Sequence, residues 1–194
     1  MNLLELFAAV TGALSVWLSV RQHIWSWPTA IVNVVAYTFV FHGAKLYADM
    51  ALQVVYAVLS LYGWYSWLYG GAGRTPLRPT HVPRRLAVWL SIVAIAATGV
   101  IGTVLHRTTD AALPYMDSFL SSSSLVAQWM MTRKVLEHWL VWIAVDVLYV
   151  GMFVYKELYV TAVLYAVFLA LAARGYVEWR RSMSNTPASA TRSA

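Results

Sequence analysis

Apolar residues dominate seven stretches of the chain, and clusters of polar residues mark the places where these stretches end. Each stretch is long enough to cross about 30 Å of hydrocarbon as an α-helix that rises about 1.5 Å per residue. The approximate bounds of the stretches are 3–20, 24–43, 46–69, 86–105, 114–132, 137–155 and 158–179. The pattern therefore predicts an all-α integral membrane protein with seven transmembrane helices.

An internal repeat of three helices is the second pattern. A shift of 112 residues brings Arg21 onto Arg133 and Trp27 onto Trp139. Without a gap, the same shift also aligns Tyr37 with Tyr149, Phe41 with Phe153, Gly63 with Gly175 and Trp67 with Trp179. The fourth helix returns the chain to its starting side, so the two units have the same orientation. The sequence thus predicts a 3+1+3 parallel repeat, which places a binding site between the units near the middle of the bilayer.

This repeat divides the chain into four parts. We expect a first three-helix bundle over 1–69 and a second over 114–181. Between them, 70–113 holds a basic loop, a linker helix over 86–105 and a connecting loop. The loop Gly70–Arg85 is rich in Gly, Pro and Arg and is expected in solvent, whereas the uncharged linker helix is expected to face lipid. The last part, 182–194, is small and polar and is predicted to be a disordered tail.

Composition and charge agree with a membrane protein. The chain is 60% hydrophobic and only 11% charged, whereas about a quarter of the residues of a soluble domain are charged. Eleven of the fourteen Lys and Arg residues follow odd-numbered helices, which predicts an outside N-terminus and a cytoplasmic C-terminus. The basic balance therefore needs no nucleic-acid partner. Because the chain has no cysteine, it forms neither disulfides nor thiolate metal sites.

Asp146 lies in the middle of the sixth stretch, where a carboxylate is costly. Trp139, Trp142, Asp146 and Tyr149 follow i, i+3, i+7, i+10 spacing and so share one helix face. A charge at this depth costs several kcal/mol unless it faces a polar interior. Asp146 therefore indicates the wall of an aromatic, polar cavity. The alternative is that it only joins two helices through hydrogen bonds.

Other helices contribute polar and aromatic candidates for the same cavity. These site residues are Asn33, Tyr37, Gln53, Tyr56, Ser124, Gln128, Thr161 and Tyr165. For Asn33 the alternative is a hydrogen bond that only joins two helices, and for the run Ser121–Ser124 it is close helix packing, which small residues favour in membranes. Asp49 lies near a helix start and is interpreted as structural.

Several aromatic residues lie near the predicted span ends. We interpret them as interfacial residues of the kind that line both membrane surfaces. This group comprises Trp25, Trp27, Trp67, His138 and Trp179.

The candidate site combines aromatic faces, amides, hydroxyls and one carboxylate. Such a set suits a flat heteroaromatic ring with a hydroxylated or weakly cationic appendage. No Lys or Arg lies deep in a predicted span, which favours a neutral or cationic solute over a nucleotide. The sequence has no phosphate-binding glycine loop, HExxH metal motif or nucleophile–base pair, so we expect neither an enzyme nor a cofactor. The remaining alternative is a non-transporting membrane scaffold or sensor.

Six short motifs resemble those of the PnuC-type vitamin transporters. They are Trp27-Pro-x4-Asn33, Lys45-Leu-Tyr-Ala-Asp49, Tyr62-Gly-Trp-Tyr-Ser-Trp67, Leu125-Val-Ala-Gln-Trp129, His138-Trp-x2-Trp142-x3-Asp146 and Thr161-x2-Leu-Tyr165. The resemblance covers nearly all of residues 1–181. It implies a fold like that of a full-length SWEET transporter, a homotrimer, and a place in the bacterial inner membrane.

The same resemblance implies a function. Members of this family, best known for nicotinamide riboside, carry an unphosphorylated vitamin by facilitated diffusion, and a cytoplasmic kinase traps it. Relatives carry thiamine or riboflavin, so both stay open as substrates. The matching positions associate Trp139, Trp142, Asp146, Gln128 and Asn33 with the substrate.

Overall fold

The computed structural model describes residues 3–43, 47–109, 113–155, 157 and 159–184, and this part of the chain is all-α. The elements are α1 (Leu3–Val20), α2 (Ser26–Gly43), α3 (Tyr47–Tyr69), the short 3-10 helix η1 (Ala72–Arg74), α4 (Arg84–Thr108), α5 (Pro114–Thr132), α6 (His138–Tyr155) and α7 (Tyr159–Ser184). The predicted fold class of seven helices is confirmed.

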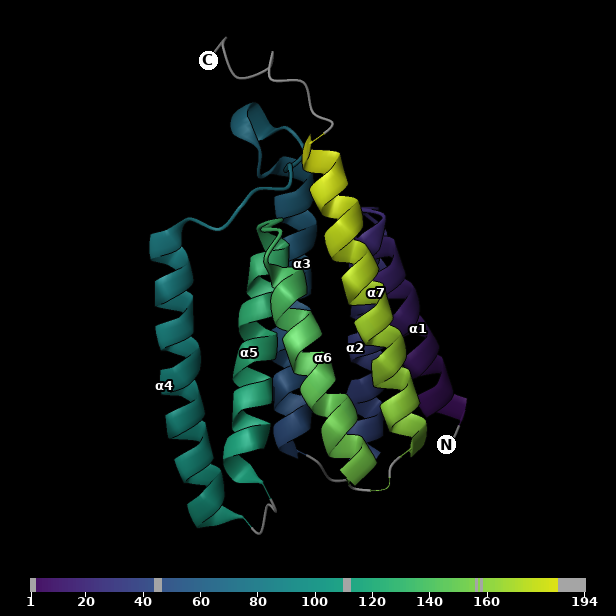
Figure 1. The fold of residues 1–194 in the computed structure, drawn as a ribbon. Coiled ribbons are helices and arrows are strands. Elements are labelled where there is room, and N and C mark those ends of the chain that lie inside the picture. Colours follow the sequence, from purple (N-terminus) through teal and green to yellow (C-terminus); the bar gives the residue numbers. More distant parts are fainter. Residues whose placement is uncertain (1–2, 44–46, 110–112, 156, 158, 185–194) are drawn as a thin grey trace.

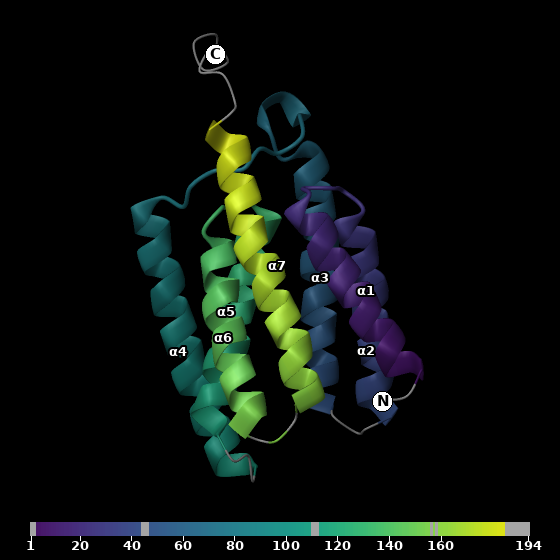
Figure 2. The same cartoon turned by 45° about the vertical axis from the view of Figure 1, so that its right-hand side comes forward.

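Six of the helices form a closed ring. Within the first unit α2 packs against α1 and α3, and within the second α6 packs against α5 and α7. Two contacts join the units, one between α3 and α5 and the other between α1 and α7. We refer to these as the α3–α5 seam and the α1–α7 seam. The linker helix α4 packs on α5 and stands outside the ring (Figures 1 and 2).

Three helices in the described part of the chain are long and apolar enough to cross a membrane by length and composition alone. They are Arg84–Thr108, His138–Tyr155 and Thr161–Ser184. In α1 the stretch Leu6–Val20 is apolar but shorter. The helices α2, α3 and α5 carry polar residues that line the centre of the ring, such as Asn33, Gln53 and Gln128. A polar lining of this kind lowers the apolarity of a helix without exposing polar groups to lipid. The start of α1 and the end of α7 lie at opposite ends of the bundle, as an odd number of helices requires (Figure 1).

Two predicted boundaries need correction. The helix expected over 86–105 runs from Arg84 to Thr108, because long basic side chains at helix ends reach solvent while their backbone stays helical. The last helix continues to Ser184, so 182–184 belong to α7 and not to the predicted tail. The rest of the predicted tail lies outside the described residues.

The repeat seen in the sequence is also present in the backbone. The turn from α1 to α2 contains Gln22 with φ 52°, and the turn from α5 to α6 contains Lys134 with φ 51°. A positive φ is uncommon for residues other than glycine. These two residues are partners under the shift of 112, so both units make the same unusual turn.

Four tryptophans form a buried cluster at the end of the ring that carries the C-terminus of α7. Trp27 and Trp179 are 0% exposed and Trp67 is 2% exposed. Trp27 meets Trp67 edge-on at 5.3 Å between ring centroids, and Trp139 meets Trp179 edge-on at 5.7 Å. The interpretation of Trp27, Trp67 and Trp179 as interfacial residues is therefore wrong. The two units converge here, so the tryptophans at these helix ends are covered by protein and do not reach the membrane surface.

The interpretation of His138 as an interfacial residue is also wrong. Its side chain is 0% exposed and packs against the rings of Trp139 and Trp179. Its Nδ1 lies 2.6 Å from the carbonyl oxygen of Val135. His138 is thus a core residue of the tryptophan cluster. Trp25, by contrast, is an exposed residue, as an interfacial position requires.

Candidate substrate site

A cavity of about 620 Å³ lies at the centre of the six-helix ring. The described residues that line it come from α1, α2, α3, α5, α6 and α7, and none comes from α4. Its wall includes every residue that the sequence singled out for the site: Asn33, Tyr37, Gln53, Tyr56, Ser124, Gln128, Trp139, Trp142, Asp146, Tyr149, Thr161 and Tyr165. The helical periodicity thus located one common cavity.

The wall of this cavity is symmetric in position but asymmetric in chemistry. Some repeat partners in the wall are identical, such as Tyr37 with Tyr149 and Phe41 with Phe153. Others differ: Val16 is paired with Gln128, Ala30 with Trp142, Val34 with Asp146 and Gln53 with Tyr165. In most of these mixed pairs the second unit supplies the larger or more polar side chain. The two units therefore line the cavity with different side chains.

Asp146 is the acidic residue of this wall. Its side chain is 4% exposed, and it lies close enough to Tyr165 for an electrostatic interaction. Tyr37, Tyr56 and Tyr149 also lie near the Tyr165 phenol. Tyr165 therefore sits at the centre of a group of polar side chains drawn from α2, α3 and α6. This position agrees with the cavity interpretation of Asp146, and its contact with a solute stays a prediction.

Aromatic rings gather at the end of the cavity opposite the tryptophan cluster. Tyr37 stacks on Phe41 at 5.6 Å and Tyr149 stacks on Phe153 at 5.7 Å. Tyr165 lies 4.6 Å from Tyr149, between ring centroids. The cavity thus lies between a Tyr–Phe layer and a Trp layer. Flat faces at both ends suit the stacking of a planar ring.

Asn33 and Ser124 also take part in helix packing. The amide nitrogen of Asn33 donates to the carbonyl oxygen of Ala8 at 2.6 Å and joins α2 to α1. Ser124 forms a side-chain hydrogen bond with Tyr56 and joins α5 to α3. Both residues therefore have the structural role that was the alternative for them, and both also line the cavity. The side chain of Asp49 lies outside the described residues.

Two matching hydrogen bonds join the two units at the tryptophan end of the cavity. The indole N–H of Trp67 donates to the carbonyl oxygen of Met131 at 3.0 Å across the α3–α5 seam. The indole N–H of Trp179 donates to the carbonyl oxygen of Ser19 at 3.0 Å across the α1–α7 seam. Donors and acceptors are both repeat partners. Each unit thus holds the other with the same bond, and we call these two bonds the tryptophan latches.

Some wall residues escaped the sequence prediction. They include Ser15, Ser19, Trp27, Phe41, Ser60 and Phe153. Phe41 and Phe153 carried a usable signal, because they are repeat partners in register with Tyr37 and Tyr149. The small serines carried none, since their spacing is equally typical of helix packing.

The fold and the cavity define a membrane transporter built from two three-helix units, and the comparisons give its family. A sequence model described as nicotinamide mononucleotide transporter matches residues 2–181. The chain belongs to this family.

Characterised relatives support the assignment. The nicotinamide riboside transporter PnuC of Escherichia coli (strain K12) is 25% identical, with 92% of this chain and 85% of the relative aligned. PnuC of Neisseria mucosa is 28% identical over 90% of this chain and 70% of the relative. The riboflavin/roseoflavin transporter RibM of Streptomyces davaonensis is 24% identical over 90% and 83%. All three are transporters, so this chain is a transporter and not an enzyme.

A solved structure shares the fold. The crystal structure of the vitamin B3 transporter PnuC aligns with a TM-score of 0.75 at 24% identity. The alignment covers 95% of this chain and 83% of the other. The PnuC-type resemblance seen in the motifs is thus confirmed, and so is the predicted fold.

Proposed function

We propose that this protein carries unphosphorylated nicotinamide riboside across the membrane by facilitated diffusion. The observation that carries the proposal is the central cavity, whose wall combines aromatic faces with amide, hydroxyl and carboxylate groups from both units. The two PnuC relatives are named as transporters of this riboside. The non-transporting scaffold is set aside, because the chain belongs to a transporter family.

The cavity wall offers a partner for each part of the riboside. Trp142 and Tyr149 present aromatic faces to the pyridinium ring, whose positive charge also favours cation–π contact. Gln128 both donates and accepts and so suits the ribose hydroxyls, with Asn33 on the opposite unit. Asp146 complements the cationic ring and orients the polar network around it.

The absence of basic residues argues for the riboside over the mononucleotide. Among the described residues that line the cavity there is no Lys, Arg or His. A phosphate group would thus enter beside the carboxylate of Asp146 without a cation to pair with it. Burying an unpaired charge in this way is costly. We therefore expect discrimination against phosphorylated forms, although the family is described by the mononucleotide.

Transport follows from rocking of the two units around the cavity. We infer that the described state is closed at its tryptophan end, where the latches join the units. Opening this end and closing the Tyr–Phe end would pass the solute across, as in other repeat-built transporters. The excess of basic residues at the tryptophan end supports a cytoplasmic position for this end. We expect a bacterial inner membrane, with the N-terminus outside. A cytoplasmic kinase would then trap the riboside, and we expect a homotrimer.

A binding panel tests the proposed substrate. Calorimetry on detergent-purified protein would compare nicotinamide riboside, thiamine and riboflavin, with nicotinamide mononucleotide as the phosphorylated control. We expect binding of the riboside alone. Riboflavin is a second candidate because RibM is a relative. Binding of riboflavin or thiamine without the riboside would overturn the substrate and keep the mechanism.

A further inference from the structure

The loop between α3 and α4 is fastened to the second unit. The amide of Thr80 donates to the carbonyl oxygen of Lys134 at 3.0 Å, and the amide of Leu136 donates to the carbonyl oxygen of Thr80 at 2.8 Å. Thr80 and Val135 thereby form an isolated parallel bridge. We call residues 77–82 the strap. Its residues are exposed or half-buried, and its backbone is bonded to the turn between α5 and α6.

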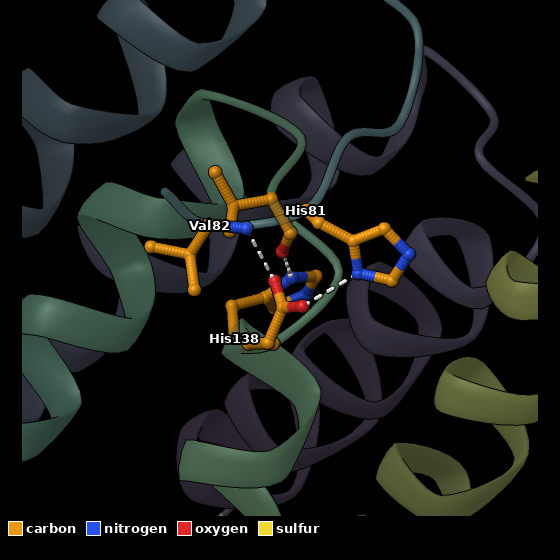
Figure 3. Close-up of polar contacts among 5 residues, drawn as sticks. His81, Val82 and His138 are labelled. Atoms are coloured by element: carbon orange, nitrogen blue, oxygen red, sulfur yellow. Dashed lines mark hydrogen bonds and ion pairs between the residues drawn. The ribbon is translucent and has the colours of Figure 1, made fainter. Parts of the chain in front are cut away.

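Glu137 fixes the far end of the strap with both of its carboxylate oxygens. One oxygen lies 2.7 Å from Nδ1 of His81, and the other accepts the amide of Val82 at 2.8 Å (Figure 3). Partial burial opposes the charged form, but the hydrogen bonds from His81 and Val82 outweigh it, so the pKa of Glu137 lies below its usual range. The carboxylate is therefore charged at neutral pH, and its bonds are charge-assisted.

Lys134 fixes the near end of the strap to the tryptophan latch. Its ammonium donates to the carbonyl oxygen of Leu77 at 2.9 Å and lies 4.4 Å above the ring of Trp67. The amide of Leu77 in turn donates to the carbonyl oxygen of Trp67 at 3.0 Å. The latch bond of Trp67 to Met131 connects this group of contacts to α5. The strap, the last turns of α3 and the α5–α6 turn are thus one connected network.

The α1–α7 seam shows no comparable network of charged groups in the described part of the chain. The repeat partner of Lys134 is the neutral Gln22, whose amide donates to the hydroxyl of Ser182 at 2.9 Å. The latch of Trp179 to Ser19 matches that of Trp67 in length. The α3–α5 seam also has a hydrogen bond from Arg133 to Tyr62 at 3.0 Å. Two seams that are related by the repeat are therefore fastened unequally.

We propose that the strap makes the α3–α5 seam the hinge of the closed end, so that this end opens by separation of the α1–α7 seam. Glu137 and Lys134 act as positioning residues, because they contact the strap and not the cavity. The inference rests on the proposed transport by rocking units. It adds an asymmetry to that motion, since a cluster of charge-assisted and backbone bonds is harder to break than neutral bonds such as those of Trp179 and Gln22.

Spin-label distances across the two seams test the proposal without any solute. The chain has no cysteine, so labels attach only at introduced sites. One pair, Q22C with S182C, reports on the α1–α7 seam, and the other, Y62C with R133C, reports on the α3–α5 seam. Because each pair removes one seam hydrogen bond, the effect of E137Q is measured within one labelled pair, with that bond absent in every variant compared. Each labelled pair would be measured in lipid nanodiscs in three backgrounds: native Glu137, E137Q and the control E178Q. The control alters an exposed ion pair within α7.

With Glu137 in place, we expect a broad or two-component distance distribution at the α1–α7 seam and a narrow one at the α3–α5 seam. E137Q should broaden the α3–α5 distribution, and E178Q should leave both unchanged. The hinge proposal is overturned if the α3–α5 distance distribution is as broad as the α1–α7 distribution, or if E137Q does not alter it. Addition of nicotinamide riboside is a separate arm. If the riboside shifts neither seam, the proposed substrate fails while the comparison of the seams still stands.

Discussion

The rings of Trp67 and Trp179 meet between the two units, with their centroids 5.8 Å apart. They are repeat partners, and each donates its indole N–H to a main-chain carbonyl of the opposite unit. This pair of tryptophans therefore lies at the contact between the two units, where each unit is bonded to the other. Any separation of the units at this end must part these two rings or their latch bonds.

Replacing Trp179 by phenylalanine should favour opening of the tryptophan end. W179F keeps an aromatic ring but removes the donor across the seam that separates, which costs about 1 kcal/mol, or a change of about fivefold in the opening equilibrium. W67F removes the matching donor at the hinge seam, which stays joined, and should change the opening equilibrium less. The reporter is a cysteine at Ser60, a buried wall residue of the cavity. We expect faster labelling of S60C by an impermeant thiol reagent added from the C-terminal side. W89F, on exposed α4, is the control, and equal rates in all variants would contradict the latch.

Removal of the carboxylate of Asp146 should abolish efficient uptake. D146N keeps the size of the side chain but loses the charge that complements a cationic ring, so we expect uptake to fall at least about tenfold. Uptake into vesicles, normalised to protein in the membrane, measures the effect. D117N, at the start of α5 and outside the cavity wall, should behave like wild type. Normal uptake by D146N would remove Asp146 from the site.

Two glycines should tolerate no side chain, because each lies against a cluster tryptophan. A Cβ at Gly63 would lie 2.2 Å from the ring of Trp27, and one at Gly175 would lie 2.6 Å from the ring of Trp139. Overpacking of this kind costs about 1–3 kcal/mol. G63A and G175A should therefore lower the melting temperature of the purified protein. G99A is the control, since a Cβ there meets nothing within 4 Å, and equal melting temperatures would show that the rings move aside freely.

The buried ammonium of Lys134 predicts a pH dependence of stability. Burial lowers the pKa of Lys134 from 10.5 to about 8, so the unfolded chain binds this proton more tightly than the folded one. The contribution of this group to stability is therefore lowest below about pH 8 and rises up to about pH 10.5. Melting temperatures of wild type and K134M would be compared from about pH 7.5 to about pH 9.5. The melting temperature of wild type should increase relative to that of K134M as pH rises. A difference in melting temperature that stays constant with pH would contradict the lowered pKa of Lys134.

Helical periodicity and the repeat predicted the parts of the site that depend on which face of a helix a residue occupies. Asp146 is costly in lipid, so its face had to turn inward, and Trp139, Trp142 and Tyr149 turned inward with it. The shift of 112 residues predicted which helices are equivalent. These arguments need only local geometry, and they placed the predicted residues around one cavity.

Position along a helix was a poorer guide than the helix face. Trp27, Trp67 and Trp179 lie near helix ends, where tryptophans often meet the membrane interface. In this protein the two units converge at that end and bury all three. The strap escaped prediction for a similar reason. Its bonds join residues such as Val82 and Glu137 that are distant in sequence, and no local pattern indicates such a pairing.

Flux through purified protein would show whether the riboside crosses by facilitated diffusion. Labelled nicotinamide riboside would be added to proteoliposomes that contain no kinase, no nucleotide and no ion gradient. We expect saturable entry that stops when inside and outside concentrations are equal, with nicotinamide mononucleotide neither entering nor competing. Absence of riboside entry beyond that of empty liposomes, or equal entry of the mononucleotide, would contradict this expectation.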